Sequence, residues 1–309
     1  MNEFTYLAGM TVVASIPYLL ASLGTMISGR AGVFNVAQEG IMLLGASVGF
    51  VVSLKLKMNL AGLVAAALVG ALMGLILGVT TTYLNLDQFV VGLALFFFST
   101  GAAGLLFRQV IGETGTPPLI PTIGKVKIPL LGDIPFFGTV LFRQNLLVYL
   151  TYALATGLYW FLYRTNAGLA YRSVGENPKA SDSLGIRVPR VRIGAATIGG
   201  AMMAVGGAYL PLVFTGLFTD GMINGRGWLA IALTFFGGWR PQFIVIGGVF
   251  FAALETLAIR AEVSPIGIPS QVLLAAPYVL TLLVMVAVSK RAVAPAFLGR
   301  NYDRESRTL

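Results

Sequence analysis

Polar side chains that could handle a solute are concentrated in residues 28–45, SGRAGVFNVAQEGIMLLG, next to a long apolar run. This segment carries Arg30, Asn35, Gln38 and Glu39, and its glycines allow close backbone approach. Amide and carboxylate groups at the mouth of a membrane span, near a helix N-terminus, can line a route for a polar solute. The same groups could instead cap a helix, so both interpretations remain open.

A second polar segment, residues 164–192, contains the sequence GENPKASDSLGIRVPR. Asn177 is placed to cap a short helix, Pro178 to begin it and Gly185 to end it. We therefore expect a helix of about one to two turns from Lys179 to Leu184. A short helix between two spans can transmit motion from a soluble partner. The alternative is a solvated basic loop.

The third segment, residues 219–239, carries Asp220, Asn224, Arg226 and two tryptophans, Trp228 and Trp239. Tryptophan at the end of a span is usually an interface anchor. The run Gly225-Arg226-Gly227 echoes residues 29–32, a weak indication of an internal repeat. Glu255 follows inside an apolar run, where an ionisable residue is a candidate functional group or lies near the interface.

Several kinds of chemistry lack the residues they need. The chain has no cysteine and no histidine, so thiolate chemistry, disulfides and the usual transition-metal ligands are missing. Without a clustered acidic pair, hydrolytic or metal-assisted catalysis has little to work with, and we predict neither catalytic nor metal-binding residues. The formal charge of +9 gathers in a few loops, which favours membrane topology and lipid contact over nucleic-acid binding.

The elements that must position these groups are membrane-spanning helices. Of the 309 residues, 57% are hydrophobic and 11% are charged, whereas about 25% are charged in soluble domains. Long unbroken apolar runs favour helices over a barrel, so we predict an all-α integral membrane protein formed by residues 1–309 as one domain. About nine spans are expected, with eight to ten plausible, and the second and seventh are short enough to be tilted, broken or re-entrant. They lie near 6–27, 41–54, 60–79, 89–107, 144–163, 192–215, 228–239, 242–260 and 271–289.

Basic residues predict the orientation of these spans. Lysines and arginines gather in residues 164–192 and again after residue 289, so both regions are expected in the cytoplasm. Residues 108–143 and the N-terminus are then expected outside. The 108–143 segment is rich in proline, which predicts a stiff irregular loop. It could be a plain connector or a docking surface for an external partner.

Five stretches together carry a family resemblance that covers nearly the whole chain in order. Residues 28–45 resemble the signature of ABC-importer permeases in the nucleoside and simple-sugar branch, relatives of ribose and branched-chain amino acid permeases. Residues 85–95 (NLDQFVVGLAL), 175–186 (GENPKASDSLGI), 225–232 and 277–281 are similar to further segments of that branch. The chain departs from the pattern at Ala37-Gln38, at Ser181 and at residues 96–98, where Phe replaces a segment that often holds Asn.

The resemblance implies a type II ABC-importer-like permease in the cytoplasmic (inner) membrane, crossing it several times. It also implies a second permease subunit, identical or different, a cytoplasmic ABC ATPase, an extracytoplasmic substrate-binding protein and surrounding lipid. The chain itself is expected to be no enzyme and to need no cofactor. It lacks the G-x-x-x-x-G-K-[ST] phosphate loop, so ATP is expected on the partner.

Within this interpretation the solute is a nucleoside first and a simple sugar second. The alternative is an ion-coupled secondary transporter of a small polar solute, which would need ionisable groups deep in its spans. Only Glu255 and Glu39 are candidates for that role. The expected substrate-pathway residues are Asn35, Gln38, Glu39, Asn85, Gln88 and Asn224. The expected ATPase-coupling residues are Glu176, Asn177, Pro178, Lys179, Ala180, Gly185 and Ile186.

Overall fold

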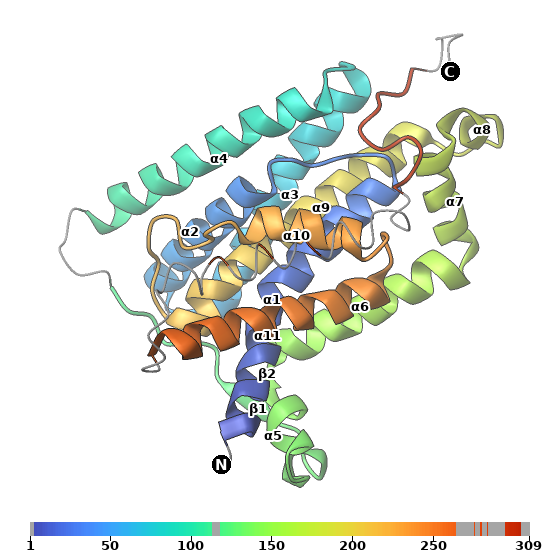
Figure 1. The fold of residues 1–309 in the computed structure, drawn as a ribbon. Coiled ribbons are helices and arrows are strands. Elements are labelled where there is room, and N and C mark those ends of the chain that lie inside the picture. The colour runs from blue at the N-terminus through green and yellow to red at the C-terminus, as the bar shows by residue number, and fades with distance from the viewer. Residues whose placement is uncertain are drawn as a thin grey trace.

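The computed structural model describes residues 3–112, 118–263, 275, 279, 283 and 294–303, and these are mostly helical (Figure 1). The long helices are α1 (Glu3–Arg30), α2 (Gln38–Leu56), α3 (Asn59–Tyr83), α4 (Gln88–Ile111), α6 (Leu146–Arg164), α9 (Val188–Tyr209) and α11 (Pro241–Val263). Shorter helices are α5 (Phe137–Leu141), α7 (Asn166–Glu176), α8 (Pro178–Ser183) and α10 (Arg226–Phe236). A 3₁₀ turn, η1 (Leu131–Asp133), and a π-helical turn, η2 (Leu210–Thr215), complete the helical elements.

Helix α1 forms the centre of the bundle, and its residues from Val12 to Gly29 are almost all buried. It packs against α9, α10 and α11, while α9 also packs on α2 and α3. Glycines permit the closest approaches. A Cβ atom on Gly24 would lie 2.6 Å from the carbonyl oxygen of Gly199, and one on Gly200 would lie 3.1 Å from the Cα of Gly74. In lipid, small residues at helix interfaces allow this contact between backbones.

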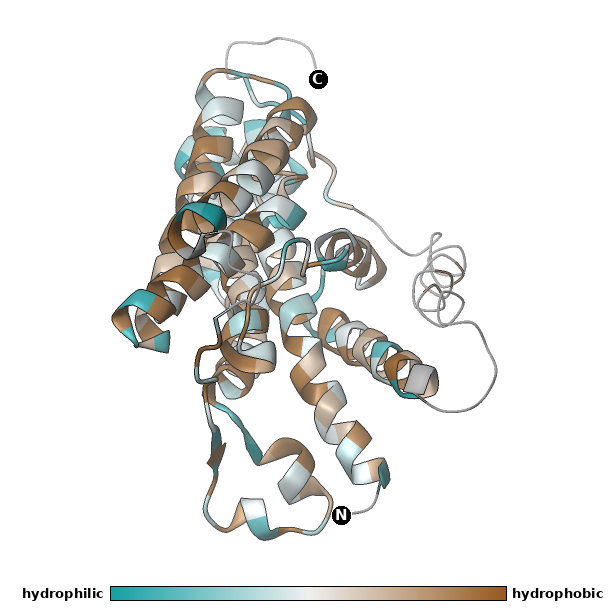
Figure 2. Ribbon diagram, turned by 90° about the vertical axis from the view of Figure 1, so that its left-hand side faces the viewer, coloured by the Kyte–Doolittle hydropathy of each residue, from teal (hydrophilic) through white to brown (hydrophobic). Residues whose placement is uncertain are grey.

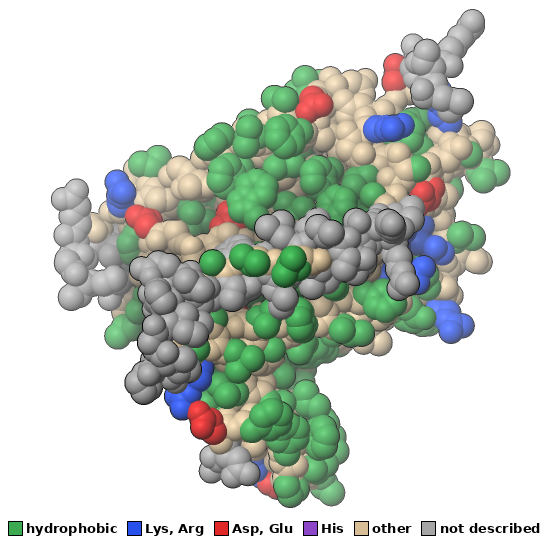
Figure 3. Space-filling view, viewed as in Figure 1, with side chains coloured by type: hydrophobic (Ala, Val, Ile, Leu, Met, Phe, Trp, Pro, Cys, Tyr) green, Lys and Arg blue, Asp and Glu red, His purple; other side chains and the backbone are tan. Residues whose placement is uncertain are grey.

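The outer helices expose apolar side chains in a way that suits lipid. On α3, Leu60, Val64, Leu68 and Leu72 recur every four residues, and all are exposed. This spacing places them on one face of the helix. Figure 2 shows the apolar character of the helices along their length, and Figure 3 shows charged side chains mainly near the two ends of the visible face. This pattern fits a mostly helical membrane domain, and the predicted all-α fold holds apart from one short two-stranded sheet.

In the described part of the chain, seven helices are long and apolar enough to cross a membrane. They correspond to the predicted spans one to six and eight, and the second is a full helix of 19 residues. The seventh differs, because α10 has only 11 residues, or about 16 Å against a hydrocarbon core of about 30 Å. The predicted ninth span, 271–289, lies almost wholly outside the described residues. So does the stretch 277–281 that carries part of the family resemblance.

The two ends of the bundle can be told apart by their contacts. At one end, here called the α5 end, the ring of Phe4 stacks on Phe136 with centroids 5.6 Å apart, and the Asn59 side chain donates to the Pro121 carbonyl at 2.7 Å. At the other, the α8 end, Arg30 lies 3.9 Å from Glu176 and the Phe297 amide donates to the Gly175 carbonyl at 2.9 Å. The N-terminus therefore shares an end with residues 118–145, as the charge pattern predicted.

Residues 118–145 are more ordered than the irregular loop that we expected. Strands β1 (Lys125–Lys127) and β2 (Arg143–Asn145) pair antiparallel, and η1 and α5 lie between them. Asp133 bonds Lys127 at 2.5 Å and Arg143 at 3.1 Å, one from each strand, and the Lys127 hydrogen bond is the main cause of its lowered pKa. Strand pairing and the two ion pairs of Asp133 thus give the segment a defined structure, and its stiffening by proline stays a prediction.

Candidate functional site

The strongest candidate for a site inside the bundle is the break in the seventh crossing. The segment that makes this crossing, residues 216–239, starts at the α5 end, where the Ile120 amide donates to the Gly216 carbonyl at 2.8 Å. It reaches the α8 end, where the Trp239 carbonyl accepts from Arg30 at 3.0 Å. Residues 216–225 are irregular and only the second half is the helix α10. Irregular backbone at membrane depth is tolerated where it is buried in protein or lines a cavity.

Backbone conformation explains why the break occurs here. Gly216, Gly221 and Gly225 have φ values of +75°, +72° and +81°, and Asn224 has a φ of +49°. Glycine adopts this left-handed region freely, and asparagine tolerates it better than most residues. A helix cannot continue through such a run, so helix α10 begins only at Arg226.

Glu39 closes the break from the opposite side. This carboxylate, in the first turn of α2, accepts hydrogen bonds from the Gly225 amide at 2.7 Å and from the Gly227 amide at 2.6 Å. A Cβ atom on Gly227 would lie 2.6 Å from the Cα of Glu39, so the contact requires glycine. The carboxylate thus sits at two helix N-termini, whose amides and dipoles both favour negative charge.

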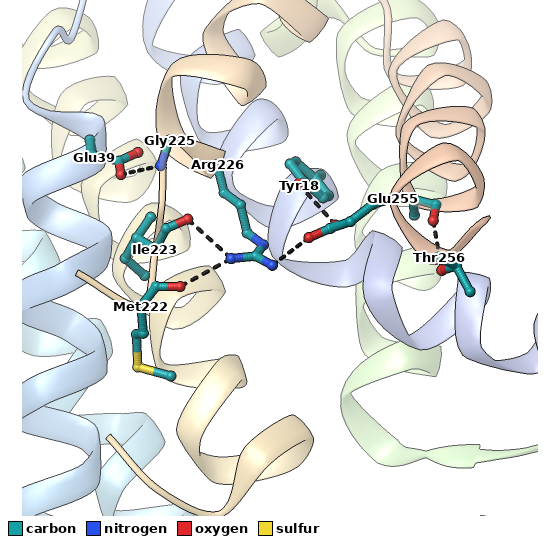
Figure 4. A network of polar contacts seen from close by, with 9 residues as sticks. Tyr18, Glu39, Met222, Ile223, Gly225, Arg226, Glu255 and Thr256 are labelled. Carbon is teal, nitrogen blue, oxygen red and sulfur yellow. Dashed lines mark hydrogen bonds and ion pairs between the residues drawn. The ribbon is translucent and has the colours of Figure 1, made fainter. Parts of the chain in front are cut away.

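Arg226 and Glu255 form a charged pair beside Glu39 (Figure 4). The Arg226 guanidinium also donates to the carbonyls of Met222 at 3.0 Å and Ile223 at 3.2 Å. Glu255, inside α11, accepts from the Tyr18 hydroxyl of α1 at 3.0 Å. Only 19% of each charged side chain is exposed. The network therefore joins α1, α10 and α11, and Glu39 adds α2.

A pocket of about 370 Å³ opens onto this charged pair. Its wall is largely apolar and comes from α1, η2 and α11, and its polar lining includes Arg226, Glu255 and Thr256. The Arg260 guanidinium, which also lines it, bonds the Glu3 carboxylate at 2.5 Å. An apolar cavity with a few convergent polar groups is a common form of small-molecule site.

The structure separates the six predicted pathway residues into three places. Asn35 and Gln38 are fully buried; the Asn35 side chain accepts from the Ala37 amide at 2.9 Å, and Gln38 accepts from the Thr25 hydroxyl. The Gln38 side-chain nitrogen has no hydrogen-bond partner among the described residues. Glu39 and Asn224 lie together at the break, where Asn224 is exposed.

Gln88 and Asn85 lie instead at the α8 end. The Gln88 side chain accepts from the Phe34 amide at 2.8 Å and donates to the Arg300 carbonyl at 3.1 Å. Asn85 is exposed with a φ of +52°, and its carbonyl accepts from Asn301 at 2.7 Å. These two residues hold chain segments together, so the six do not form one continuous surface in this chain.

The predicted loop helix is present as α8. The Asn177 side chain caps it by accepting from the Ala180 amide at 3.0 Å, and Pro178 occupies its first turn. Gly185 ends it with a φ of +82°, and the Ile186 amide closes the turn onto the Ser181 carbonyl at 3.0 Å. Ala180 is exposed, Lys179 is half-buried, and Leu184 is 81% exposed, an apolar surface that sequence reasoning did not single out.

Helix α7 fixes α8 to the bundle. The Tyr171 hydroxyl donates to the Ile27 carbonyl of α1 at 2.6 Å, and burial raises the pKa of this phenol, so it stays a donor. A Cβ atom on Gly175 would lie 2.8 Å from the Arg30 carbonyl carbon, so the last turn of α7 rests directly on the backbone after α1. Helix α8, which bonds α7 through the hydroxyls of Ser181 and Ser173, is therefore linked to the end of α1.

Two features of the α8 end were not predicted from the sequence. Arg192, predicted as one of several loop charges, is 1% exposed and donates to the carbonyls of Gly32 at 3.0 Å and Arg300 at 2.5 Å. Residues 294–303, read only as a basic tail, lie across the same region. Neither had a sequence signal, because both depend on backbone carbonyls brought together by the fold.

The acidic side chains of the described residues are dispersed or bonded to other groups. Across the residues that the structure describes, no three acidic side chains come together as a possible metal site. The carboxylates of Glu39 and Glu255 are instead bonded to backbone amides, to Arg226 and to Tyr18.

Comparison with known proteins gives a consistent set of relatives. The family described as "Branched-chain amino acid transport system / permease component" matches residues 7–289. The guanosine ABC transporter permease protein NupQ of Bacillus subtilis is 34% identical, with 96% of each chain covered. The nucleoside ABC transporter permease protein NupC of Lactococcus lactis is 33% identical, with 98% of each covered.

A third relative is named for a different solute. The putative glucose ABC transporter permease protein TsgC13 of Haloferax volcanii is 35% identical over 83% of this chain and 78% of its own. No solved structure matches the chain.

Proposed function

Because this chain belongs to the branched-chain amino acid transport system permease family, we propose that it is the membrane subunit of an ATP-driven importer of nucleosides. The observation that carries the proposal is the near-complete alignment with NupQ and NupC, at 34% and 33% identity. The chain is a multi-pass protein of the inner membrane and a transport subunit, not an enzyme. A cytoplasmic ABC ATPase would bind and hydrolyse the ATP.

The fold that accompanies this function is a type II importer-like permease with about nine spans. Seven long helices and the broken crossing at residues 216–239 support this count, and the sequence predicts one more span at 271–289. Discontinuous helices near the middle of a bundle are common where transporters bind solutes or ions.

Helix α8 is the proposed docking point for the ATPase. It lies between the short helix α7 and the long helix α9, and Ala180 and the following Leu184 are exposed. An exposed leucine beside a small alanine provides an apolar contact that a groove on a partner could cover. The proposed coupling residues Glu176, Asn177, Lys179 and Ile186 lie within six residues of Ala180 along the chain.

The remaining partners follow from the family. A second permease subunit, identical or different, would complete the route for the solute. An extracytoplasmic binding protein would deliver the solute to the α5 end, where residues 118–145 form an ordered surface. Glu39 and Asn224 at the break are our first candidates for the route, and Asn35, Gln38, Asn85 and Gln88 are further candidates.

The nucleoside is preferred to a simple sugar on the similarity to the two nucleoside permeases. A sugar is the second candidate because TsgC13, a putative glucose permease, is 35% identical. The ion-coupled transporter is less well supported. Its best carboxylates, Glu39 and Glu255, already bond two backbone amides and an arginine, respectively, and these contacts would compete with a coupling ion.

Reconstituted vesicles containing this chain, its ATPase and its binding protein test the function directly. Uptake of labelled guanosine should require ATP and should continue when proton and sodium gradients are collapsed. Unlabelled nucleosides should compete, whereas a pentose or hexose should not. Loss of uptake with the gradients, while ATP remains, would reject the importer, and competition by a sugar alone would reject the nucleoside.

A further inference from the structure

Arg30 occupies a junction between three elements at the α8 end. Its guanidinium donates to the Trp239 carbonyl at 3.0 Å and to the Gly238 carbonyl at 3.5 Å, both in the turn between α10 and α11. It also donates to the Tyr163 hydroxyl of α6 at 3.0 Å and lies 3.9 Å from the Glu176 carboxylate of α7. The Arg30 side chain is 13% exposed, against 52% for Glu176.

The α10–α11 turn is seated firmly against the end of α1. Trp239 is fully buried with a φ of +58°, and its ring fills the space beside Gly29, where a Cβ atom would lie 2.6 Å from the Cη2 of Trp239. Phe235 packs edge-on against the Trp239 ring at 5.1 Å. Because Gly238 and Trp239 are just past the C-terminus of α10, their carbonyls favour a nearby cation. The turn and Arg30 should therefore move together.

On the side of the proposed docking helix, α7 joins Arg30 to α8. Glu176 is the last residue of α7, and Asn177, the cap of α8, follows it. A Cβ atom on Gly175 would lie 3.2 Å from the Gly32 amide nitrogen, so α7 rests on the backbone that follows Arg30. A displacement of α8 would thus reach Arg30 through contacts already in place.

Helix α10 connects the junction to the break inside the bundle. It is a single helix of 11 residues whose N-terminus is held by Glu39 and whose first residue, Arg226, pairs with Glu255. A short helix moves as a rigid rod, so a shift at Phe236, the last residue of α10, would appear at Arg226, about 15 Å away.

We propose that Arg30 relays movement of the ATPase-docking helix α8 to the α10–α11 turn, and through α10 to the break at residues 216–225. This inference rests on the proposed function and names the residue through which ATP binding would reach the solute route. Arg30 acts through other groups, so its role is positioning. The planar guanidinium suits this task, because it presents five donors in a fixed fork and can hold carbonyls and a carboxylate at once.

The test compares Arg30→Gln and Arg30→Lys with a matched control, Arg164→Gln, which removes a charge from an exposed arginine at the same end. Because the chain has no cysteine, Arg240→Cys places one thiol in the exposed part of the α10–α11 turn. Four quantities are measured on each reconstituted complex: ATPase co-purification, ATP hydrolysis, guanosine uptake, and the rate of thiol modification at position 240 with and without a trapped ATP analogue.

Arg30→Gln should keep ATPase co-purification but lower uptake about tenfold or more, as expected when coupling between two sites is lost. The analogue-dependent change in thiol modification should disappear. Arg164→Gln should stay within about twofold of the parent in all four quantities, as for most surface changes. Arg30→Lys should assemble but show a reduced change in modification, since a point charge cannot replace the fork.

An unaltered change in thiol modification in Arg30→Gln would overturn the relay, as would uptake equal to that of the parent. If Arg30→Gln does not assemble, Arg30→Lys decides: full recovery of uptake and of the thiol signal would mean that Arg30 supplies only charge. A parent complex without ATP-dependent uptake would instead reject the proposed function, so the two failures are distinguishable.

Discussion

At the scale of single residues, the charges inside the bundle are held by specific partners. Glu39 accepts hydrogen bonds from two backbone amides. Glu255 accepts a hydrogen bond from the Tyr18 hydroxyl and forms an ion pair with Arg226. A charge removed from water is tolerated only when it is paired and hydrogen-bonded. These residues therefore fix how α2, α10 and α11 meet, and a change in any one of their contacts would be felt by the other helices.

Ala180 gives the sharpest test of the docking surface. Replacing it with Arg adds a long charged side chain to an exposed position of α8, where we expect a groove of the ATPase. The helix itself should tolerate the change, because arginine is a good helix former. We expect a membrane-inserted protein that loses guanosine uptake and co-purifies poorly with the ATPase.

The matched control is Ala180→Ser, which keeps the residue small and should preserve both quantities. Normal uptake and co-purification in Ala180→Arg would contradict the docking assignment and would make residues 164–192 an ordinary basic loop. Reduced membrane insertion of Ala180→Arg alone would also count against it, since the prediction requires an intact membrane domain.

Local signals in the sequence predicted local geometry well. The cap at Asn177 and the helix end at Gly185 depend only on nearby residues, and the structure has both. The partners of Glu39 could not be predicted, because the Gly225 and Gly227 amides lie 186 and 188 residues away along the chain. Asn35 and Gln38 have side chains that suit a solute route, but the surrounding sequence does not predict that both are fully buried.

At the scale of the elements, hydropathy identified the helices but not how each begins. The seventh run was short in sequence, and the structure explains it as an irregular segment followed by α10. The glycines at 216, 221 and 225 were visible, yet glycine is frequent in membrane helices, so its presence alone does not predict a break. The left-handed backbone at these positions is a property of the fold.

The contact between α3 and α9 depends on glycine. A Cβ atom on Gly74 would strike the Ala196 carbonyl oxygen and lie 3.0 Å from the Cα of Thr197. Since both neighbours are backbone, Gly74→Ala must push the helices apart, at a cost of about 1–3 kcal/mol. We expect a lower midpoint of thermal unfolding for the protein in detergent.

The same substitution on α4 provides the control. A Cβ atom on Gly101 would meet nothing within 4 Å, so Gly101→Ala should leave the midpoint unchanged or raise it, because alanine favours a helix over glycine. Equal midpoints for Gly74→Ala and Gly101→Ala would refute the close packing of α3 on α9.

At the scale of the whole molecule, successive crossings formed by the described residues run in alternating directions between the α5 end and the α8 end. The Arg260 side chain bonds Glu3 at the α5 end, and the next described segment, 294–303, bonds Gly175 and Gly32 at the α8 end. The basic loops predicted this arrangement correctly in relative terms, because residues 164–192 and the described part of the tail, 294–303, lie at one end. Which end faces the cytoplasm is a property of the membrane and stays a prediction.

Accessibility of single cysteines measures that orientation. Lys125 is exposed on β1 at the α5 end, and Arg187 is exposed after α8 at the other, so Lys125→Cys and Arg187→Cys place one thiol at each end of a chain that has none of its own. The excess of lysine and arginine around α8 should hold that end in the cytoplasm. In right-side-out vesicles, a membrane-impermeant maleimide should modify position 125 at once and position 187 only after the membrane is permeabilised, while the parent stays unmodified. The opposite pattern would mean that the α8 end faces outward, where no cytoplasmic ATPase could reach α8. That result would contradict both the predicted orientation and the assignment of α8 as the coupling helix.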